Sequence, residues 1–276
     1  MITGRRCLVS GGGGSIGSEL VRQLAPTNTI HILDIDETSA FDLCEQQRFA
    51  GHEVSISIGD IRDRRIVDDV MYEFKPDIVF HAAARKHVTP SEQNPREAVE
   101  VNVIGTCNVV EAAQDNKVEN LIFISTDKAV NATSIMGTTK RLGEIIVRNA
   151  NYTSVRFGNV LGSRGSVIPI WQKQMDEGIP LTITDPNMER FFMTIEQAVN
   201  LVIQAAEIGT GGEIIVLDMG KRLKIIDIAN QVVAAAGATS TIRIVGSRPG
   251  EALREQLMTA EEEARAVKQG NFYIIR

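Results

Sequence analysis

The tetrapeptide Ser-Thr-Asp-Lys places a hydroxyl, a carboxyl and an amine next to one another in the chain. Thr126, Asp127 and Lys128 directly follow an apolar run that is typical of a buried strand. Met136 and Lys140 come next, with the i, i+4 spacing of one helix face. The hydroxyl, carboxyl and amine groups can move protons to and from a bound substrate, whereas the thioether of Met136 cannot. A lone Asp-Lys pair is more often a solvated turn or a cap, so this interpretation depends on the rest of the chain.

A glycine-rich turn follows the first apolar run and opens a helical pattern, with its glycines spaced G-x-x-G-x-x-G. Glycine lets the backbone turn tightly and approach a pyrophosphate, while the helix N-terminus supplies amide donors and a positive dipole. Because the turn lies between a strand and a helix, we predict a dinucleotide site rather than a flexible turn. The predicted phosphate turn comprises Gly11, Gly14, Ser15, Ile16 and Gly17.

An acidic residue closes the second predicted strand. Asp34 lies about 20 residues past the glycines, where a carboxylate can accept both ribose hydroxyls of NAD. No arginine follows it immediately to bind a 2′-phosphate, so the sequence favours NAD over NADP. A helix cap is the alternative role, which Asp36 or Glu37 fits better. Asp60 and Ile61, after the third strand, are candidates for flanking the adenine, although a polar turn has the same pattern.

Short β-branched runs alternate with helical patterns through residue 157. This alternation is typical of an α/β protein with a doubly wound parallel sheet of the Rossmann type, which binds ligands at the carboxyl ends of its strands. We predict strands at 7–10, 30–34, 54–58, 77–83, 120–125 and 154–157, and helices at 15–24, 38–50, 64–74, 95–116 and 134–149.

The rest of the chain is richer in glycine, proline and charge, which indicates a smaller C-terminal domain of loops at the carboxyl edge. A helix at 194–207 and a strand at 213–218 are expected to return to the main sheet. We assign residues 1–157 to the NAD-binding domain, with 191–218 returning to it, and residues 158–190 and 219–276 to the smaller domain.

Composition excludes several classes of function. The 276 residues are 43% hydrophobic with a formal net charge of -6, and acids and bases are interspersed, which argues against a nucleic-acid surface. No run approaches the length of a membrane span and no signal peptide is apparent, so we expect a soluble, cytoplasmic protein. Neither a disulfide framework nor a metal site is expected from the spacing of Cys7, Cys44, Cys107, His31, His52, His81 and His87.

Seven segments resemble the capsular-polysaccharide branch of the extended short-chain dehydrogenases, whose members include UDP-N-acetylglucosamine 4,6-dehydratases. Most members of the superfamily carry a Tyr-x-x-x-Lys pair, but larger, membrane-attached members of this branch carry Met in place of Tyr, as at Met136. The resembling segments are HAAARKHV (81–88), NPREAVEVNVIGTCNVVEAA (94–113), STDKAVN (125–131), MGTTKRLGE (136–144), VRFGNVLGSRGSVIP (155–169), ERFFMTIEQAV (189–199) and SRPGEAL (247–253).

The resemblance implies a reaction. NAD takes hydride from C4 of the sugar, a base removes the acidified C5 proton, the 6-hydroxyl leaves, and hydride returns to C6. By resemblance, Asp127 is the acid for the 6-hydroxyl and Lys128 the C5 base, which requires a lowered lysine pKa. Thr126 would bind the C4 oxygen and Lys140 the nicotinamide ribose. Without the tyrosine, the C4 hydroxyl proton needs another acceptor, and we expect Asp127 or neutral Lys128.

The resemblance also implies which residues bind the two ligands and where the chain pairs with a copy of itself. Relatives form homodimers through the helices at 95–116 and 134–149, although apolar positions there, such as Val99, Val103 and Ile146, are equally suited to a core. By resemblance, the residues expected to bind the cofactor also include Ala82, Ala83, Lys86, Asn102 and Lys140. The UDP-sugar set is Lys86, His87, Asn159, Val167, Arg190, Arg248 and Glu251, in which arginine suits a diphosphate.

Two other functions remain open. A UDP-sugar 4-epimerase uses the same oxidation but needs no acid and base for elimination, so Asp127 with Lys128 favours dehydration, with the C5 configuration retained or inverted. A catalytically inactive NAD-binding regulator would explain the missing tyrosine. It gives no reason, however, for keeping Thr126, Asp127, Lys128 and Lys140 together.

Overall fold

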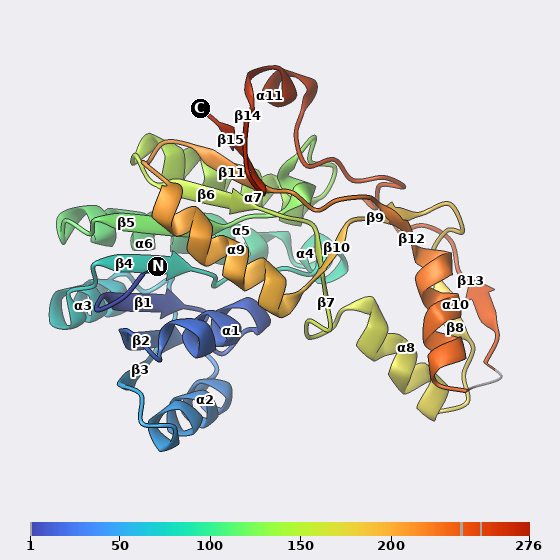
Figure 1. Ribbon diagram of the computed structural model, residues 1–276, viewed down its shortest axis with the longest axis horizontal. Coiled ribbons are helices and arrows are strands. Elements are labelled where there is room, and N and C mark those ends of the chain that lie inside the picture. Colours follow the sequence, from blue (N-terminus) through green and yellow to red (C-terminus); the bar gives the residue numbers. More distant parts are fainter. Residues whose placement is uncertain (1, 238–239, 249) are drawn as a thin grey trace.

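The computed structural model describes residues 2–237, 240–248 and 250–276. Within these ranges the strands of the main sheet lie in the order β14-β15-β11-β6-β5-β4-β1-β2-β3 (Figure 1). Pairing is parallel from β3 to β11, whereas β15 is antiparallel to both β11 and β14. The strands are β1 (Arg6–Ser10), β2 (Thr29–Asp34), β3 (Val54–Ile58), β4 (Ile78–His81), β5 (Asn120–Ile124), β6 (Thr153–Arg156), β11 (Ile214–Leu217), β14 (Val267–Gln269) and β15 (Phe272–Ile275).

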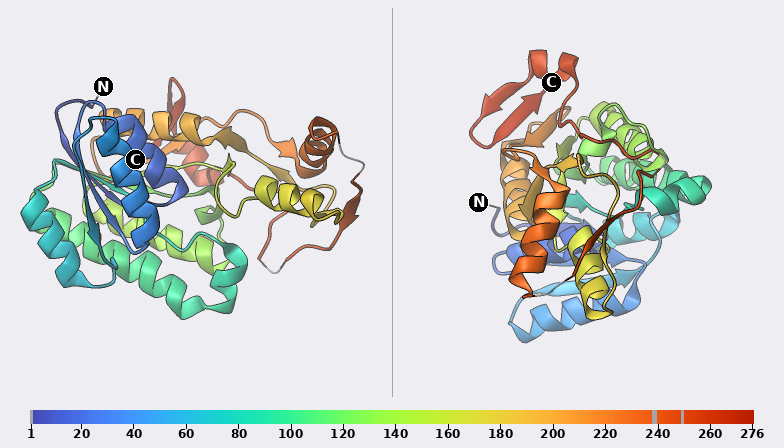
Figure 2. Two further views of the ribbon diagram at one scale, coloured as in Figure 1. Left: turned by 90° about the horizontal axis from the view of Figure 1, so that it is seen from below. Right: turned by 90° about the vertical axis from the view of Figure 1, so that its right-hand side faces the viewer.

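Helices cover both faces of this sheet (Figure 2). Two large apolar clusters, one on each face, bury the β-branched strand residues, which confirms the predicted doubly wound α/β fold. On one face lie α1 (Ser15–Leu24), α2 (Glu37–Phe49) and α9 (Ile195–Ile208). On the other lie α3 (Arg64–Phe74), α5 (Pro95–Val99), α6 (Gly105–Asp115) and α7 (Ile135–Asn149), with α4 (Val88–Gln93) packed on α7.

The helix predicted at 95–116 is present, with one irregular turn inside it. A π-helical turn, Glu100–Ile104, separates α5 from α6. Within it the buried Asn102 amide accepts from Arg85 N at 2.7 Å and donates to Arg85 O at 2.9 Å. Gly105 follows, where a Cβ would lie 2.6 Å from Ile61 Cδ1. The wider turn therefore brings Asn102 to the backbone that follows β4, a contact that helical periodicity does not predict.

A smaller region lies beyond the carboxyl edge and has its own apolar cluster around the fully buried Trp171. Its strands pair as β7 with β10, β9 with β12 and β8 with β13. Its elements are β7 (Asn159–Leu161), α8 (Val167–Asp176), β8 (Leu181–Ile183), β9 (Glu189–Arg190), β10 (Phe192–Thr194), β12 (Leu223–Lys224), α10 (Ile225–Ala235) and β13 (Ile242–Ile244).

The boundary assigned from the sequence differs from the structure at the C-terminus. Residues 267–275 form the hairpin of β14 and β15, which extends the main sheet instead of belonging to the smaller region. A two-residue Gly-Asn loop joins these strands, with Gly270 at φ 57°. This loop is a hairpin signal, but the strands beside it are short. Helix α11 (Ala260–Arg265) precedes the hairpin.

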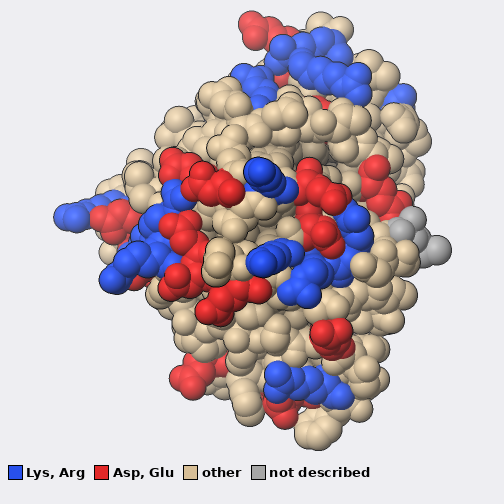
Figure 3. Space-filling model, turned by 90° about the vertical axis from the view of Figure 1, so that its left-hand side faces the viewer, with Lys and Arg blue, Asp and Glu red and all other residues tan. Residues whose placement is uncertain are grey.

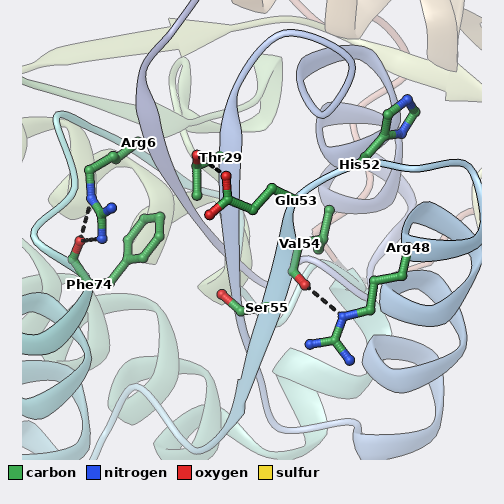
Figure 4. Close-up of a pocket in the computed structure, with 8 residues that line it drawn as sticks. All are labelled: Arg6, Thr29, Arg48, His52, Glu53, Val54, Ser55 and Phe74. Atoms are coloured by element: carbon green, nitrogen blue, oxygen red, sulfur yellow. Dashed lines mark hydrogen bonds between the residues drawn. The ribbon is translucent and has the colours of Figure 1, made fainter.

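The outer surface carries mixed charges. On the face shown in Figure 3, Lys and Arg side chains lie among Asp and Glu side chains rather than in a continuous basic patch. A crevice of about 470 Å³ lies at the amino ends of β1 to β3 (Figure 4). Its arginines are engaged by backbone carbonyls, since Arg6 donates to Phe74 O and Arg48 to Val54 O. No helix in the described ranges is both long and apolar enough to cross a bilayer.

Candidate functional site

A cavity of about 1310 Å³ opens at the carboxyl edge, between the sheet and the smaller region. It is large enough for two ligands of nucleotide size. The predicted residues in its wall are Gly11, Gly14, Ser15, Ile16, Gly17, Ala82, Lys86, His87, Thr126, Asp127, Lys128, Met136, Lys140, Asn159, Val167, Arg190, Arg248 and Glu251. The predicted residues outside its wall are Asp34, Asp60, Ile61, Ala83 and Asn102.

The phosphate turn requires its glycines. Gly11 has φ 71°, and a Cβ there would lie 2.6 Å from the backbone of Ala83. A Cβ on Gly17 would lie 2.1 Å from Gly11 O, so the first turn of α1 packs directly on the loop. This arrangement leaves the amide groups at the start of α1 facing the cavity, which suits a pyrophosphate.

Asp34 supports this turn. Its carboxylate accepts from Gly13 N at 2.7 Å and from Asp36 N at 2.9 Å, while Asp36 caps α2. The carboxylate therefore lies beside the phosphate turn, where a dinucleotide places its adenosine ribose.

Arg164, which the sequence analysis did not single out, ties the smaller region to the phosphate turn. Its backbone N–H donates to Ser15 Oγ at 3.0 Å, and its guanidinium donates to Ser39 Oγ at 3.2 Å and to Gly13 O. The loop after β7 thus crosses the mouth of the dinucleotide site. No local pattern identifies this contact, because Gly13 and Arg164 are 151 residues apart.

Three residues expected at the cofactor lie outside the cavity wall and have side chains that contact other parts of the protein. The Asp60 carboxylate is bound by Arg62 Nε at 2.8 Å, and Ile61 is buried in the core beneath Gly105. Asn102 is 1% exposed and also donates to Thr139 Oγ1 at 2.9 Å. Asn102 therefore positions the loop after β4 and helix α7, and does not line the cavity.

The residues predicted to transfer protons lie where β5 ends, at the short 3₁₀ turn η2 (Asp127–Ala129), which Thr126 caps. The hydroxyl of Thr126 donates to Asp127 Oδ1 at 3.0 Å. Lys128 Nζ donates to Asp127 Oδ1 at 3.1 Å, to Asn159 Oδ1 at 3.0 Å and to Glu255 Oε2 at 3.0 Å. The Asp127 side chain is 0% exposed and that of Lys128 is 23% exposed. Thr126 and Lys128 therefore present polar atoms to the cavity, and Asp127 lies beneath them.

The charge state of Lys128 differs from the one that the sequence analysis required. Burial disfavours its ammonium, but the negative charges of Asp127 and Glu255 outweigh this effect and raise the pKa of Lys128. Burial likewise opposes ionisation of Asp127, yet the Lys128 ammonium and three hydrogen bonds hold the pKa of Asp127 below its ordinary value. The resting site therefore holds an ammonium on a carboxylate, and the expected lowering of the Lys128 pKa is wrong.

Helix α7 carries the second lysine. Met136 is 3% exposed in the cavity wall, one turn before Lys140. Burial lowers the pKa of Lys140 to about 7, which Glu144 partly opposes. The Lys140 amine lies 4.0 Å from the centre of the Phe123 ring, on which it packs. The protonation of Lys140 is therefore more sensitive to a nearby phosphate or ribose than that of an exposed lysine.

Gly137 sets the distance between α7 and η2, because a Cβ there would lie 2.2 Å from Lys128 O. The Gly137→Ala substitution is expected to push the two elements apart and lower kcat/KM by at least about tenfold, since a 1 Å misplacement of a catalytic group costs up to about 100-fold. Steady-state kinetics compare this variant with Thr138→Ala, which alters an exposed neighbour. Equal activity of the two variants would show that α7 and η2 move independently.

The opposite wall carries the residues expected to bind substrate. Asn159 accepts from Lys128, as described above, and the exposed Arg248 lies at the rim, where its backbone N–H donates to Glu251 Oε2 at 3.1 Å. Burial and the charge of Arg164 lower the pKa of Lys86. A nearby anion would stabilise the ammonium form of a lysine in such surroundings.

Arg190 has a different environment from the one expected of a phosphate ligand. Its guanidinium donates to Glu189 O at 2.9 Å, to Leu253 O at 3.1 Å and to Ala252 O at 2.7 Å, and its Nε lies 3.3 Å from Glu255 Oε1. Arg190 is therefore engaged in holding residues 251–255 against the cavity.

Glu255 is, with Arg164, a residue at the site that the sequence analysis missed. It is buried, it contacts Lys128 and Arg190, and it belongs to the cavity wall. Its position, four residues after Glu251 in the segment RPGEALRE, was the available signal. Charged residues in such loops are usually solvated, so the pattern alone does not distinguish Glu255.

Sequence comparison identifies relatives over nearly the whole chain. Residues 7–276 match the model of a family described as polysaccharide biosynthesis protein. The capsular polysaccharide biosynthesis protein CapD of Staphylococcus aureus is 43% identical over 276 residues, which cover 95% of this chain and 46% of CapD. The chain thus spans about half the length of CapD. A UDP-glucose 4-epimerase of Rickettsia canadensis is 36% identical over 290 residues, covering 100% of this chain and 84% of the relative.

Solved structures agree with this assignment. Pen from Bacillus thuringiensis superposes with a TM-score of 0.93 at 36% identity, over 99% of this chain and 88% of Pen. A Thermus thermophilus UDP-glucose 4-epimerase in complex with NAD superposes with a TM-score of 0.80 at 25% identity, over 92% and 90% of the two chains. The resemblance to extended short-chain dehydrogenases is confirmed, and the chain belongs to the polysaccharide biosynthesis protein family within them.

Proposed function

We propose that this chain is an NAD-dependent UDP-sugar 4,6-dehydratase that acts on UDP-N-acetylglucosamine. One observation carries the proposal: Thr126, Asp127 and Lys128 form a hydrogen-bonded acid-base set in the same cavity as the phosphate turn. An elimination needs both an acid and a base, whereas oxidation and reduction at C4 need only one group that takes and returns the hydroxyl proton.

The phosphate turn fits a dinucleotide, since its glycines leave no room for side chains and Asp34 lies beside it. When bound, NAD supplies the hydride acceptor for C4 and the hydride donor for C6. Gly11, Gly14 and Gly17 would hold its pyrophosphate, Asp34 its adenosine ribose, and Lys140 its nicotinamide ribose. We assign residues 158–190 and 219–266 to the UDP-sugar, with Arg248, Glu251 and Lys86 nearest its diphosphate and ribose.

The chain's own residues account for the first proton transfer without a tyrosine. The Thr126 hydroxyl faces the cavity and donates to Asp127 Oδ1. As the C4–O–H bond breaks, Thr126 takes that proton on its oxygen and passes its own proton to Asp127. Asp127 is ionised before this step and neutral after it, so it becomes the acid for the departing 6-hydroxyl. Lys128, at the cavity surface, takes the C5 proton and later returns it.

Incubation with UDP-N-acetylglucosamine in deuterated water tests the proposal, with the product read by NMR. We expect a 4-keto-6-deoxy sugar with deuterium at C5. The second candidate is a UDP-sugar 4-epimerase, which the 36% identity to the Rickettsia epimerase favours. A C4 epimer without exchange at C5 would establish that candidate, and unchanged substrate would establish an inactive NAD-binding protein.

Cofactor choice provides a separate prediction. Because Asp34 is an anion beside the phosphate turn, we expect NAD to bind about 100-fold more tightly than NADP, whose 2′-phosphate meets a like charge. Titration calorimetry with both cofactors measures the ratio, which Asp34→Ser should reduce to less than about tenfold. Equal binding of the two cofactors by the parent would show that Arg164, at the same corner, outweighs Asp34.

We also propose that the chain forms a homodimer through α5, α6 and α7. Apolar side chains are exposed on α5, on the π-helical turn that leads into α6 and on α7, namely Val99, Ile104, Leu142 and Ile145. Of the positions named from the sequence, Val99 is exposed, whereas Ile146 packs partly on the core. A pair of helices with exposed apolar side chains fits an interface between two copies of one chain.

A further inference from the structure

Glu255 contacts Lys128 directly, although the two residues are 127 positions apart in the sequence. Its side chain is 8% exposed, and Oε2 accepts from Lys128 Nζ at 3.0 Å. Oε1 faces Arg190 Nε at 3.3 Å, and Arg190 also holds the backbone of residues 252 and 253. The carboxyl of Glu255 is therefore fixed between two cations, and one of its oxygens lies on the amine that faces the substrate cavity.

The second carboxyl of the set is incompletely paired. Asp127 Oδ2 is buried and has no hydrogen-bond partner among the described residues. Asp127 and Glu255 are hydrogen-bond neighbours, which lowers the pKa of the first and raises that of the second. Two carboxyls can share a hydrogen bond only if one of them holds a proton. The two carboxylates can therefore take up one proton between them, and Glu255, whose pKa is raised, is the one that takes it.

The Lys128 ammonium cannot remove a proton from C5 until it has lost one of its own. Its neighbours Asp127 and Glu255 favour the ammonium, so the fold provides no resting neutral amine. We propose that Glu255 accepts a proton from the Lys128 ammonium across their 3.0 Å hydrogen bond, and so converts Lys128 into the neutral base. This role rests on the proposed function, in which Lys128 is the C5 base, and it makes Glu255 a positioning and proton-storing residue.

The protons balance over one turnover. One N–H bond of Lys128 breaks as an O–H bond forms on Glu255, which leaves a neutral amine and a neutral carboxyl. The amine then takes the C5 proton, and Asp127 holds the C4 hydroxyl proton. Water departs from C6 with the proton of Asp127, and hydride returns to C6. C5 regains a proton from Lys128, and Glu255 then returns its proton to the lysine.

The surroundings of Glu255 support proton storage near neutral pH. Burial raises the pKa of Glu255 to about 7, and the charge of Asp127 adds to this, although Lys128 and Arg190 oppose it. Arg222 also faces this segment, since its Nε donates to Glu255 O at 2.9 Å. Below about pH 7 Glu255 is already protonated and cannot accept from Lys128, so elimination should slow as the pH falls through that value.

Infrared spectroscopy of the resting protein with NAD tests the proton-storing group without relying on the reaction. We expect the carbonyl absorption of a protonated carboxyl that titrates near pH 7. Glu255→Gln, which keeps the shape, can accept from only one of Lys128 and Arg190 and cannot take a proton, should remove it. Glu263→Gln, an exposed site on α11, should keep it. If the parent shows no such absorption between about pH 6 and 8, or if Glu255→Gln retains it, the inference is overturned.

Stopped-flow turnover with UDP-N-acetylglucosamine then separates proton storage from a structural role. Glu255→Gln should form NADH at the parent's rate and then lose it at least about 100-fold more slowly, without the acid limb near pH 7. An equal loss in both phases, with the acid limb kept, would overturn the inference. If the parent makes no 4-keto-6-deoxy sugar, the proposed function fails, while the infrared result still decides whether Glu255 stores a proton.

Discussion

Lys128→Ala is expected to lower the rate of 4-keto-6-deoxy sugar formation by about 1000-fold, while hydride transfer from C4 continues. The reason lies in the placement of the two groups. Lys128 reaches the cavity surface, where it can act at C5, and Asp127 lies beneath it and receives the C4 proton through Thr126. Loss of the amine therefore stops the reaction after the first oxidation, and NADH should accumulate in stopped-flow absorbance.

Asp127→Asn is expected to slow the oxidation at C4, whereas Lys128→Ala slows the elimination that follows it. The amide cannot take the C4 proton, so we expect NAD reduction itself to slow by about 100-fold or more. Lys173→Ala, which removes an exposed lysine on α8, serves as the charge control for Lys128→Ala and should match the parent. If Asp127→Asn and Lys128→Ala each reduced bound NAD as fast as the parent, neither residue would be the first acceptor, and the relay through Thr126 would be wrong.

The nucleotide-binding half could be predicted because its signals are local. Strands such as Val54–Ile58 are short β-branched runs, and the spacing of Gly11, Gly14 and Gly17 follows from the close approach of backbone to backbone. Both patterns are set by the neighbours of a residue in the chain, so the sequence carries them directly.

The charge state of the site could not be predicted, because it is set by distant parts of the chain. Lys128 and Glu255 are 127 residues apart, and their contact reverses the expected shift of the lysine pKa. Asn102 similarly acts through a π-helical turn that helical periodicity does not reveal. Where a polar group is buried, its properties depend on which partner the fold brings to it.

A buried ion network holds this arrangement, and its loss should cost more stability than any surface pair. Arg156 is 0% exposed and donates to Glu144 Oε2 at 2.7 Å, to Glu262 Oε2 at 2.8 Å and to Leu257 O at 2.9 Å. Arg156→Met should lower the free energy of unfolding by about 3 kcal/mol, because the two buried carboxylates then keep only the partly exposed Arg141 as a cation. Urea unfolding with NAD absent measures the change.

The matched control is Arg96→Met, whose side chain is 90% exposed in its pair with Glu100, and we expect a change of less than about 1 kcal/mol. Adding Glu144→Gln and Glu262→Gln to Arg156→Met should recover part of the loss, because two buried negative charges that share only Arg141 are then gone. No recovery would assign the loss to packing instead. Since Leu257 is two residues after Glu255, Arg156→Met should also release the segment that carries Glu255, and so slow elimination in the fraction that remains folded.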